Sequence, residues 1–161
     1  MKKVILSIGF MLTAFVGFSQ QVTHTVTIDL ANVLEVTEGT TASQTLAFDA
    51  IADYEDGVVS ESASTFTFSS NLDWTVNVKA ASALFAYTGD ASGATTEMPA
   101  SVLEVSPDGT AFIALSTTDQ TFETGTAGAD KIVGATYKAD PGYAYAEGSY
   151  EIDVQYTITQ E

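Results

Sequence analysis

The chain has 161 residues with 21 acidic side chains against five basic ones, one histidine and no cysteine, and its net charge is −16 at pH 7. Without cysteine it forms neither disulfides nor a lipid anchor on a cysteine, and one histidine is too few for the usual zinc, iron and copper sites. The scarcity of cations also excludes nucleic-acid binding, which depends on neutralising phosphates.

The first 19 residues have the pattern of a secretory signal peptide. Two lysines precede an apolar run from Val4 to Phe18, and the small residues Gly17 and Ser19 suit a signal peptidase. The run is too short to span a bilayer. We therefore predict export to the periplasm, cell surface or extracellular space, with no membrane insertion after cleavage. The mature chain, residues 20–161, keeps three lysines and all 21 acids, a charge of −18.

The mature chain begins with an alternating stretch that predicts a strand, with a break near Asn32. One face carries Val22, His24, Val26, Ile28 and Leu30. We interpret His24 as a structural residue, because it lies on this apolar face. Two interpretations of residues 22–30 stay open. The segment either pairs within its own domain or adds to the sheet of a second copy by strand exchange.

The central part of the chain predicts further strands. In "QTLAFDA" the side chains of Leu46 and Phe48 are expected to face inward. The stretch "STFTFSSNLDWTVNVKA" predicts a hairpin whose turn spans residues 70–73. Its inward residues are expected to be Phe66, Phe68, Trp74, Val76 and Val78.

Weaker strands are expected around residues 84–87, 102–105 and 112–115. Strong turn signals occur at Pro107-Asp108-Gly109 and Asp140-Pro141-Gly142. The polar stretches "TGDASGATTE" and "STTDQTFETGTAGAD" are interpreted as loops. The last pair of predicted strands is "KIVGATYKA" and the closing stretch "GSYEIDVQYTITQE", joined by "DPGYAYAEG".

The closing stretch has the clearest alternation in the chain. Its apolar face carries Tyr150, Ile152, Val154, Tyr156 and Ile158. Burial of these side chains would contribute about 1.5–3 kcal/mol each, so we expect this strand to be part of the core and its removal to unfold the domain. With about seven to nine short strands and no predicted helix, the pattern is typical of a single all-β domain, an antiparallel immunoglobulin-like β-sandwich. A closed β-barrel is the alternative.

Few residues point to a site. The stretch "DYEDG" offers Asp53, Glu55 and Asp56 as oxygen ligands for calcium, although Gly57 at the fifth position and Ser64 at the twelfth break the EF-hand pattern. The alternative interpretation is a solvated acidic turn. No other cofactor is indicated. Because nothing places a partner beside the single histidine, we predict that the protein is not an enzyme.

Tyr143 and Tyr145 flank the turn in "DPGYAYAEG". Exposed aromatic rings on a β-sandwich can stack on sugars, so these two residues are candidate glycan ligands. In the alternative, one packs beneath the loop and the other braces the strands.

The segments "NLDWTVNVKA" and "GSYEIDVQYTITQE" together resemble WxL-like and pilin-like domains, which are small exported bacterial β-sandwich surface proteins. The resemblance covers most of residues 22–159. Trp74-Thr75-Val76 and Tyr156-Thr157-Ile158 stand where WxL domains carry two Trp-x-Leu motifs, so cell-wall binding is not carried over. The resemblance implies a non-enzymatic surface or envelope protein for structure or adhesion, of the fimbrial-subunit type. The alternative is an extracellular module that binds carbohydrate or calcium.

Overall fold

The computed structural model describes residues 25–38, 43–60, 64–90 and 94–161. Residues 31–161 form one compact unit, and the described residues 25–30 belong to a separate N-terminal unit. The predicted signal peptide, residues 1–19, lies outside the described residues, as do Val22 and His24.

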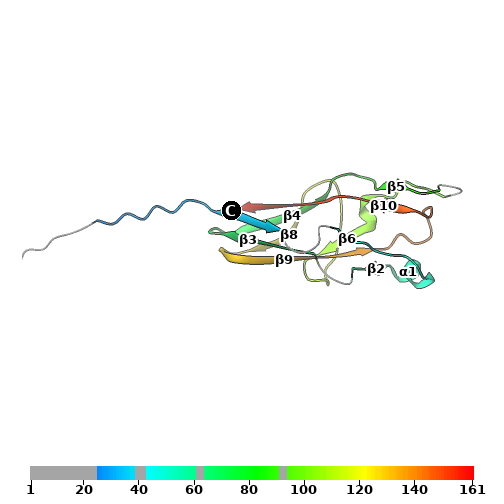
Figure 1. Cartoon of the computed structure of the whole chain (residues 1–161), viewed down its shortest axis with the longest axis horizontal. Coiled ribbons are helices and arrows are strands. Elements are labelled where there is room, and N and C mark those ends of the chain that lie inside the picture. The colour runs from blue at the N-terminus through cyan, green and yellow to red at the C-terminus, as the bar shows by residue number, and fades with distance from the viewer. Residues whose placement is uncertain (1–24, 39–42, 61–63, 91–93) are drawn as a thin grey trace, which may run out of the picture. The chain divides into compact units, whose positions relative to one another are not determined.

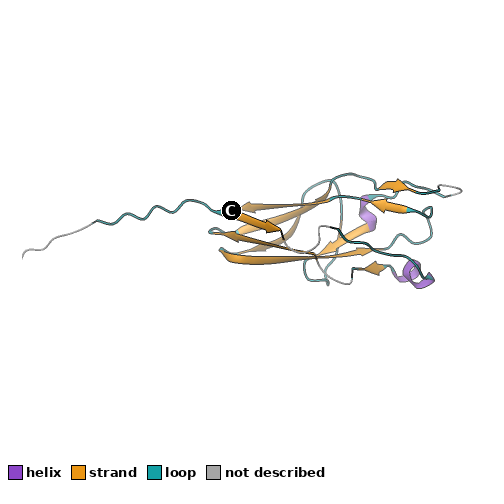
Figure 2. Cartoon of the chain, viewed as in Figure 1, coloured by secondary structure: helices purple, strands orange, loops and turns teal. Residues whose placement is uncertain are grey.

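Two antiparallel sheets form most of the compact unit (Figures 1 and 2). The first has the order β1 (Leu34–Glu38), β3 (Ser64–Ser70), β9 (Gly128–Ala139), β6 (Leu103–Ser106) and β7 (Ile113–Ala114), and β2 (Val58–Val59) also pairs with β9. The second has the order β11 (Val154–Gln160), β4 (Trp74–Ala80) and β8 (Gln120–Gly125). A separate ladder joins β5 (Ala86–Thr88) to β10 (Ser149–Glu151).

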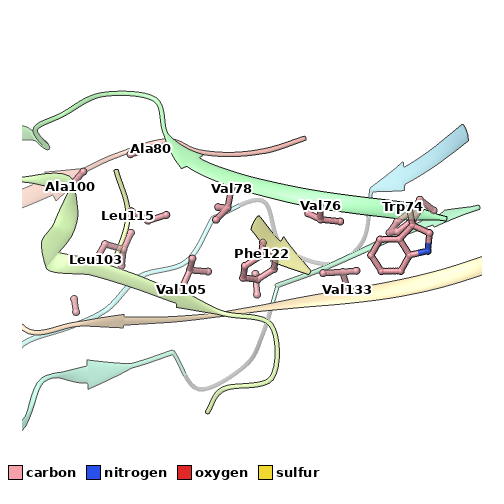
Figure 3. Packing of buried hydrophobic residues seen from close by; sticks show 13 residues of the cluster. Trp74, Val76, Val78, Ala80, Ala100, Leu103, Val105, Leu115, Phe122 and Val133 are labelled. Carbon is pink, nitrogen blue, oxygen red and sulfur yellow. The ribbon is translucent and has the colours of Figure 1, made fainter. Parts of the chain in front are cut away.

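The core lies between the two sheets. Figure 3 shows Val76 and Val78 of β4 directed toward Val133 of β9 and Val105 of β6, and all four are buried. Alternate residues of β4 are buried along its whole length, which is the period expected when one face of a strand meets the opposite sheet. The sheets end in open edges, so the fold is the predicted antiparallel β-sandwich and not a closed barrel.

The predicted hairpin over residues 64–80 is wrong in its pairing. Both strands and the turn between them are present, but β3 pairs with β1 and β9, whereas β4 pairs with β11 and β8. The two strands therefore face each other across the core, and the rings of Phe68 and Trp74 meet edge to face with centroids 4.7 Å apart. Alternation and turn residues specify a chain reversal. They do not specify whether the strands then meet by their edges or by their faces.

The same correction applies to the last predicted pair. β9 belongs to the first sheet and β11 to the second, so the two strands are not ladder partners. The closing stretch also divides into β10 and β11 around Ile152 and Asp153, and β10 pairs with β5 instead of continuing along β4.

Four elements differ from the sequence-based expectation, among them β2, which lies where no strand is predicted. A short helix, α1 (Ile51–Asp56), and a 3-10 turn, η1 (Ala100–Val102), occur in a chain for which no helix is predicted. At the start of α1, the carboxylate of Asp53 accepts hydrogen bonds from the backbone N–H of Ala50 and Asp49 at 2.7 and 2.9 Å. β8 lies in a stretch whose sequence is interpreted as a loop. Phe122 is the one buried apolar residue of this strand, so the stretch lacks the apolar alternation that predicts a strand.

Residues 25–33 form no strand, although their alternation predicts one. Within the described part of the N-terminal unit, Val26, Ile28 and Leu30 are 81%, 77% and 87% exposed. Regular structure begins at β1. A strand is stabilised by its ladder partners and by burial of one face, and an alternating sequence supplies neither by itself.

Candidate interaction surfaces

One side of the sandwich is open along β1. Leu34 and Val36 pair in register with Ser70 and Phe68, which are both buried. Directly paired residues of neighbouring strands share a face, so Leu34 and Val36 face the interior. They are nevertheless 39% and 52% exposed. The first sheet therefore extends beyond the strands of the second sheet that could cover it.

β11 forms the matching edge of the second sheet. Val154, Tyr156 and Ile158 pair with Ala80, Val78 and Val76, which are buried. The three β11 residues also face the interior, but they are only partly buried. In the described part of the chain β11 has one ladder partner, β4, and its outer edge carries no strand. The predicted inward face of the closing strand is confirmed, whereas its complete burial is not.

A groove of about 1380 Å³ runs along this open side. Its apolar lining includes Val36, Leu46, Phe48, Phe66, Phe85, Ile152, Val154, Tyr156 and Ile158. Leu46 and Phe48 pack against the core as predicted, but the strand predicted for "QTLAFDA" is wrong, because residues 43–49 form no ladder with either sheet. We call this feature the open-edge groove.

Tyr156 connects the two sheets beneath the groove. Its ring lies 5.3 Å from those of Phe66 and Phe122, and its hydroxyl is hydrogen-bonded to that of Tyr137 on β9 at 2.9 Å. Burial raises the pKa of both phenols, and the neighbouring Tyr137 adds to the rise at Tyr156. Both hydroxyls therefore stay protonated at neutral pH and remain paired.

Side chains bind the backbone just before β1. Asn71 accepts a hydrogen bond from Val33 N–H at 2.9 Å and donates one to the carbonyl oxygen of Ala31 at 2.8 Å. Gln160 donates to the carbonyl oxygen of Val33 at 2.6 Å and to the Ser70 hydroxyl at 2.9 Å. These contacts tie the start of the compact unit to the end of β11.

The calcium candidates Asp53, Glu55 and Asp56 all lie on α1, where Asp53 caps the first turn through its bonds to backbone N–H groups. In the part of the chain that the structure describes, no group of three or more acidic or histidine side chains is arranged to hold a metal ion. The calcium site stays a prediction.

The two candidate glycan residues occupy different environments. Tyr143 is 67% exposed, and its ring stacks on that of Tyr54 with centroids 5.4 Å apart and planes 13° apart. Tyr145 is half-buried, with its ring 6.3 Å from that of Tyr150. Both residues line the same groove. Sequence reasoning missed Tyr54, because its contact with Tyr143 joins positions far apart in the chain.

The open edge itself was also missed. Leu34 and Val36 are ordinary apolar positions in the sequence, and nothing local distinguishes them from covered core residues. The one available signal was an apolar alternation that runs well past the length of a normal strand, from Val22 to Val36.

Comparison with solved structures finds a distant structural neighbour. No family model matches the chain, WxL domains included, and no curated protein matches it. The neighbour is a chain from a structure whose title describes a chaperone–usher pilus and the molecular basis of rod uncoiling. The match covers 94% of this chain and 100% of the neighbour. The two are 11% identical, with a TM-score of 0.48. A match at this level is a distant likeness in chain course and carries no information on binding.

The described helices are short, and none of them is long and apolar enough to cross a membrane.

Proposed function

We propose that the protein is a non-enzymatic structural or adhesion component of the cell surface or envelope, of the fimbrial-subunit type. In this proposal the subunits associate when residues 22–30 of one copy add as a strand to the outer edge of β11 in another. The open-edge groove is the observation that carries the proposal.

The groove has the form that strand addition needs. A strand placed beside β11 would lie opposite β1 and would cover the inward-facing side chain of Val36, which lines the groove. It would also pair with the unoccupied backbone edge of β11, which gives affinity through main-chain hydrogen bonds. β11 has seven residues, a length that a segment of the size of residues 22–30 can match.

The proposed donor has a complementary pattern. Its apolar residues recur at every second position, so one face would enter the groove while Thr23, Thr25, Thr27 and Asp29 would face solvent. Val26, Ile28 and Leu30 are exposed. Their burial in a partner would remove apolar surface from water, and each Å² buried stabilises the complex by about 25 cal/mol.

A complementation experiment tests the exchange. The mature protein, expressed from residue 20, is compared with a variant lacking residues 22–30 and with Val36→Asp, which places a charge in the groove. Each variant alone is expected to be monomeric by native mass spectrometry. Their mixture is expected to form a one-to-one dimer, because the first keeps a groove and the second keeps a donor segment. The experiment is run at about 0.15 M salt, because two copies of charge −18 repel each other.

Two matched substitutions control for added charge. Thr27→Asp changes the solvent face of the donor, and Thr157→Asp changes the outward face of β11. Both are expected to associate as the mature protein does, apart from a weak added repulsion. A mature protein that stays monomeric at high concentration, or that associates equally well without residues 22–30, would contradict the proposal.

A further inference from the structure

The end of the groove beside α1 carries an aromatic surface. All five of its aromatic residues line the groove, and we call them the aromatic end: Phe48, Tyr54, Tyr143, Tyr145 and Tyr150. Phe48 and Tyr54 are in contact with ring centroids 5.5 Å apart, and Tyr54 in turn stacks on Tyr143. In Figure 1, α1 and β10 lie toward one end of the compact unit and the C-terminus toward the other, so this surface is remote from the C-terminal end of β11.

Tyr143 is held in place without being covered. Its ring lies parallel to that of Tyr54, and its hydroxyl donates to the carbonyl oxygen of Ile51 at 3.4 Å. The turn before it is set by Gly142, whose φ of 55° suits glycine. A large aromatic side chain that is fixed in orientation and still two-thirds exposed loses little conformational entropy when a ligand stacks on it.

The groove that the aromatic end lines also carries carboxylates. Asp49, Glu147, Glu151 and Asp153 line the same groove. Ionised carboxylates accept hydrogen bonds and donate none, so they suit a ligand that offers hydroxyl groups. They also repel anions, and the net charge of the chain strengthens this effect.

We propose that the aromatic end binds a neutral oligosaccharide, with the ring of Tyr143 stacked on the apolar face of one sugar. Sugars combine a face of C–H groups with a rim of hydroxyl donors, and this surface presents the complementary pair of an exposed ring and hydroxyl-accepting carboxylates. Sulfated and sialylated glycans are excluded by charge. The site lies at the α1 end of the open-edge groove, whereas the donor strand would pair along β11, so glycan binding does not require the proposed assembly.

The test is an array of neutral oligosaccharides of glucose, galactose, mannose and N-acetylglucosamine, printed beside sulfated and sialylated glycans and probed with the mature protein. Binding to at least one neutral class is expected, and none to the anionic glycans. Calorimetric titration with the best neutral glycan is then expected to show a loss of about tenfold or more in affinity for Tyr143→Ala, equivalent to about 1.4 kcal/mol. Tyr143→Phe keeps the ring and is expected to bind within a few-fold of the unchanged protein.

Ile132→Ala is the matched control, because Ile132 is 69% exposed on β9 and does not line the groove. It should leave binding unchanged. Thermal unfolding of Tyr143→Ala tells the two causes of weaker binding apart. An unchanged melting temperature indicates a lost ligand contact, and a lowered one indicates that the packing of α1 is disturbed. Absence of binding to every neutral glycan, preference for anionic ones, or equal affinity in Tyr143→Ala would each overturn the proposal.

Discussion

Trp74 fills the space that a side chain at position 125 would need. A Cβ built on Gly125 would clash with Cζ2 of the indole. The ring is further held by its N–H, which donates to the carbonyl oxygen of Thr126 at 3.0 Å. Because Trp74 also packs edge to face on Phe68, the ring has little room to move. We therefore expect Gly125→Ala to destabilise the domain by about 1–3 kcal/mol, as overpacked cores do.

Urea unfolding followed by fluorescence measures this effect directly, because Trp74 is the only tryptophan in the chain. The emission of the folded variant should also shift as the indole is displaced. Thr121→Ala, an exposed position on the same strand, is the control and should stay within about 0.5 kcal/mol. Equal stability of the two variants would contradict the close packing of Gly125 and Trp74.

The hydrogen bond between Tyr137 and Tyr156 gives a second prediction. Tyr156→Phe keeps the ring contacts of Tyr156 and removes only its hydroxyl, leaving the half-buried hydroxyl of Tyr137 without this partner. We expect a loss of about 1 kcal/mol in unfolding free energy. Tyr143→Phe at an exposed ring should cost less. Adding Tyr137→Phe should recover part of the loss, and an additive result in this double-mutant cycle would count against the bond.

The same two phenols predict an alkaline limit to stability. Their pKa values are raised above the ordinary value of 10.0, chiefly by burial. The stability that depends on the protonated phenols is fully present below pH 10.0. It is lost as the pH rises above this value, because the unfolded chain releases these protons first. Unfolding free energy should therefore fall above about pH 10. The fall should be smaller in the double variant Tyr137→Phe/Tyr156→Phe, and a slope equal to that of the unchanged protein would contradict this origin.

The hydrogen bonds of Asp108 lead us to expect a loss of stability at acidic pH. In the turn between β6 and β7 its carboxylate accepts hydrogen bonds from Thr110 N–H and the Ser106 hydroxyl, both at 2.9 Å, and from Ala111 N–H at 3.3 Å. Hydrogen bonds from Thr110, and then those from Ser106 and Ala111, hold the pKa of this carboxyl well below its usual value of 3.8. The stabilisation is present above that usual value and is lost as the pH falls below it.

We therefore expect Asp108→Ala to be less stable than the unchanged protein at neutral pH, with a difference that narrows in acid. Urea unfolding across this pH range measures the difference. Thr121→Ala, at an exposed position that carries no titratable group, is the control and should differ from the unchanged protein by the same small amount at every pH. A constant difference between Asp108→Ala and the unchanged protein at all pH values would show that the carboxylate charge is not involved.

Some residues of the candidate site could be predicted from the sequence and others could not. Tyr143 and Tyr145 could be nominated from the turn that they flank, and residues 22–30 from their alternation. Tyr54 and the pair Leu34 and Val36 could not, because their relevance depends on Tyr143 and β11, which lie far from them in the chain.

Alternation and turn chemistry determined the all-β class, the positions of most strands and which side chains face inward, as β4 and the burial of Val76 and Val78 illustrate. These are local properties, because side-chain direction in a strand repeats every second residue whatever the strand pairs with. The tertiary structure alone decided that β3 and β4 face each other across the core, that β9 and β11 lie in different sheets, and that β11 keeps an open edge. Strand pairing depends on contacts between distant segments, and one alternating sequence is compatible with a neighbour at its edge, across the core, or in another molecule.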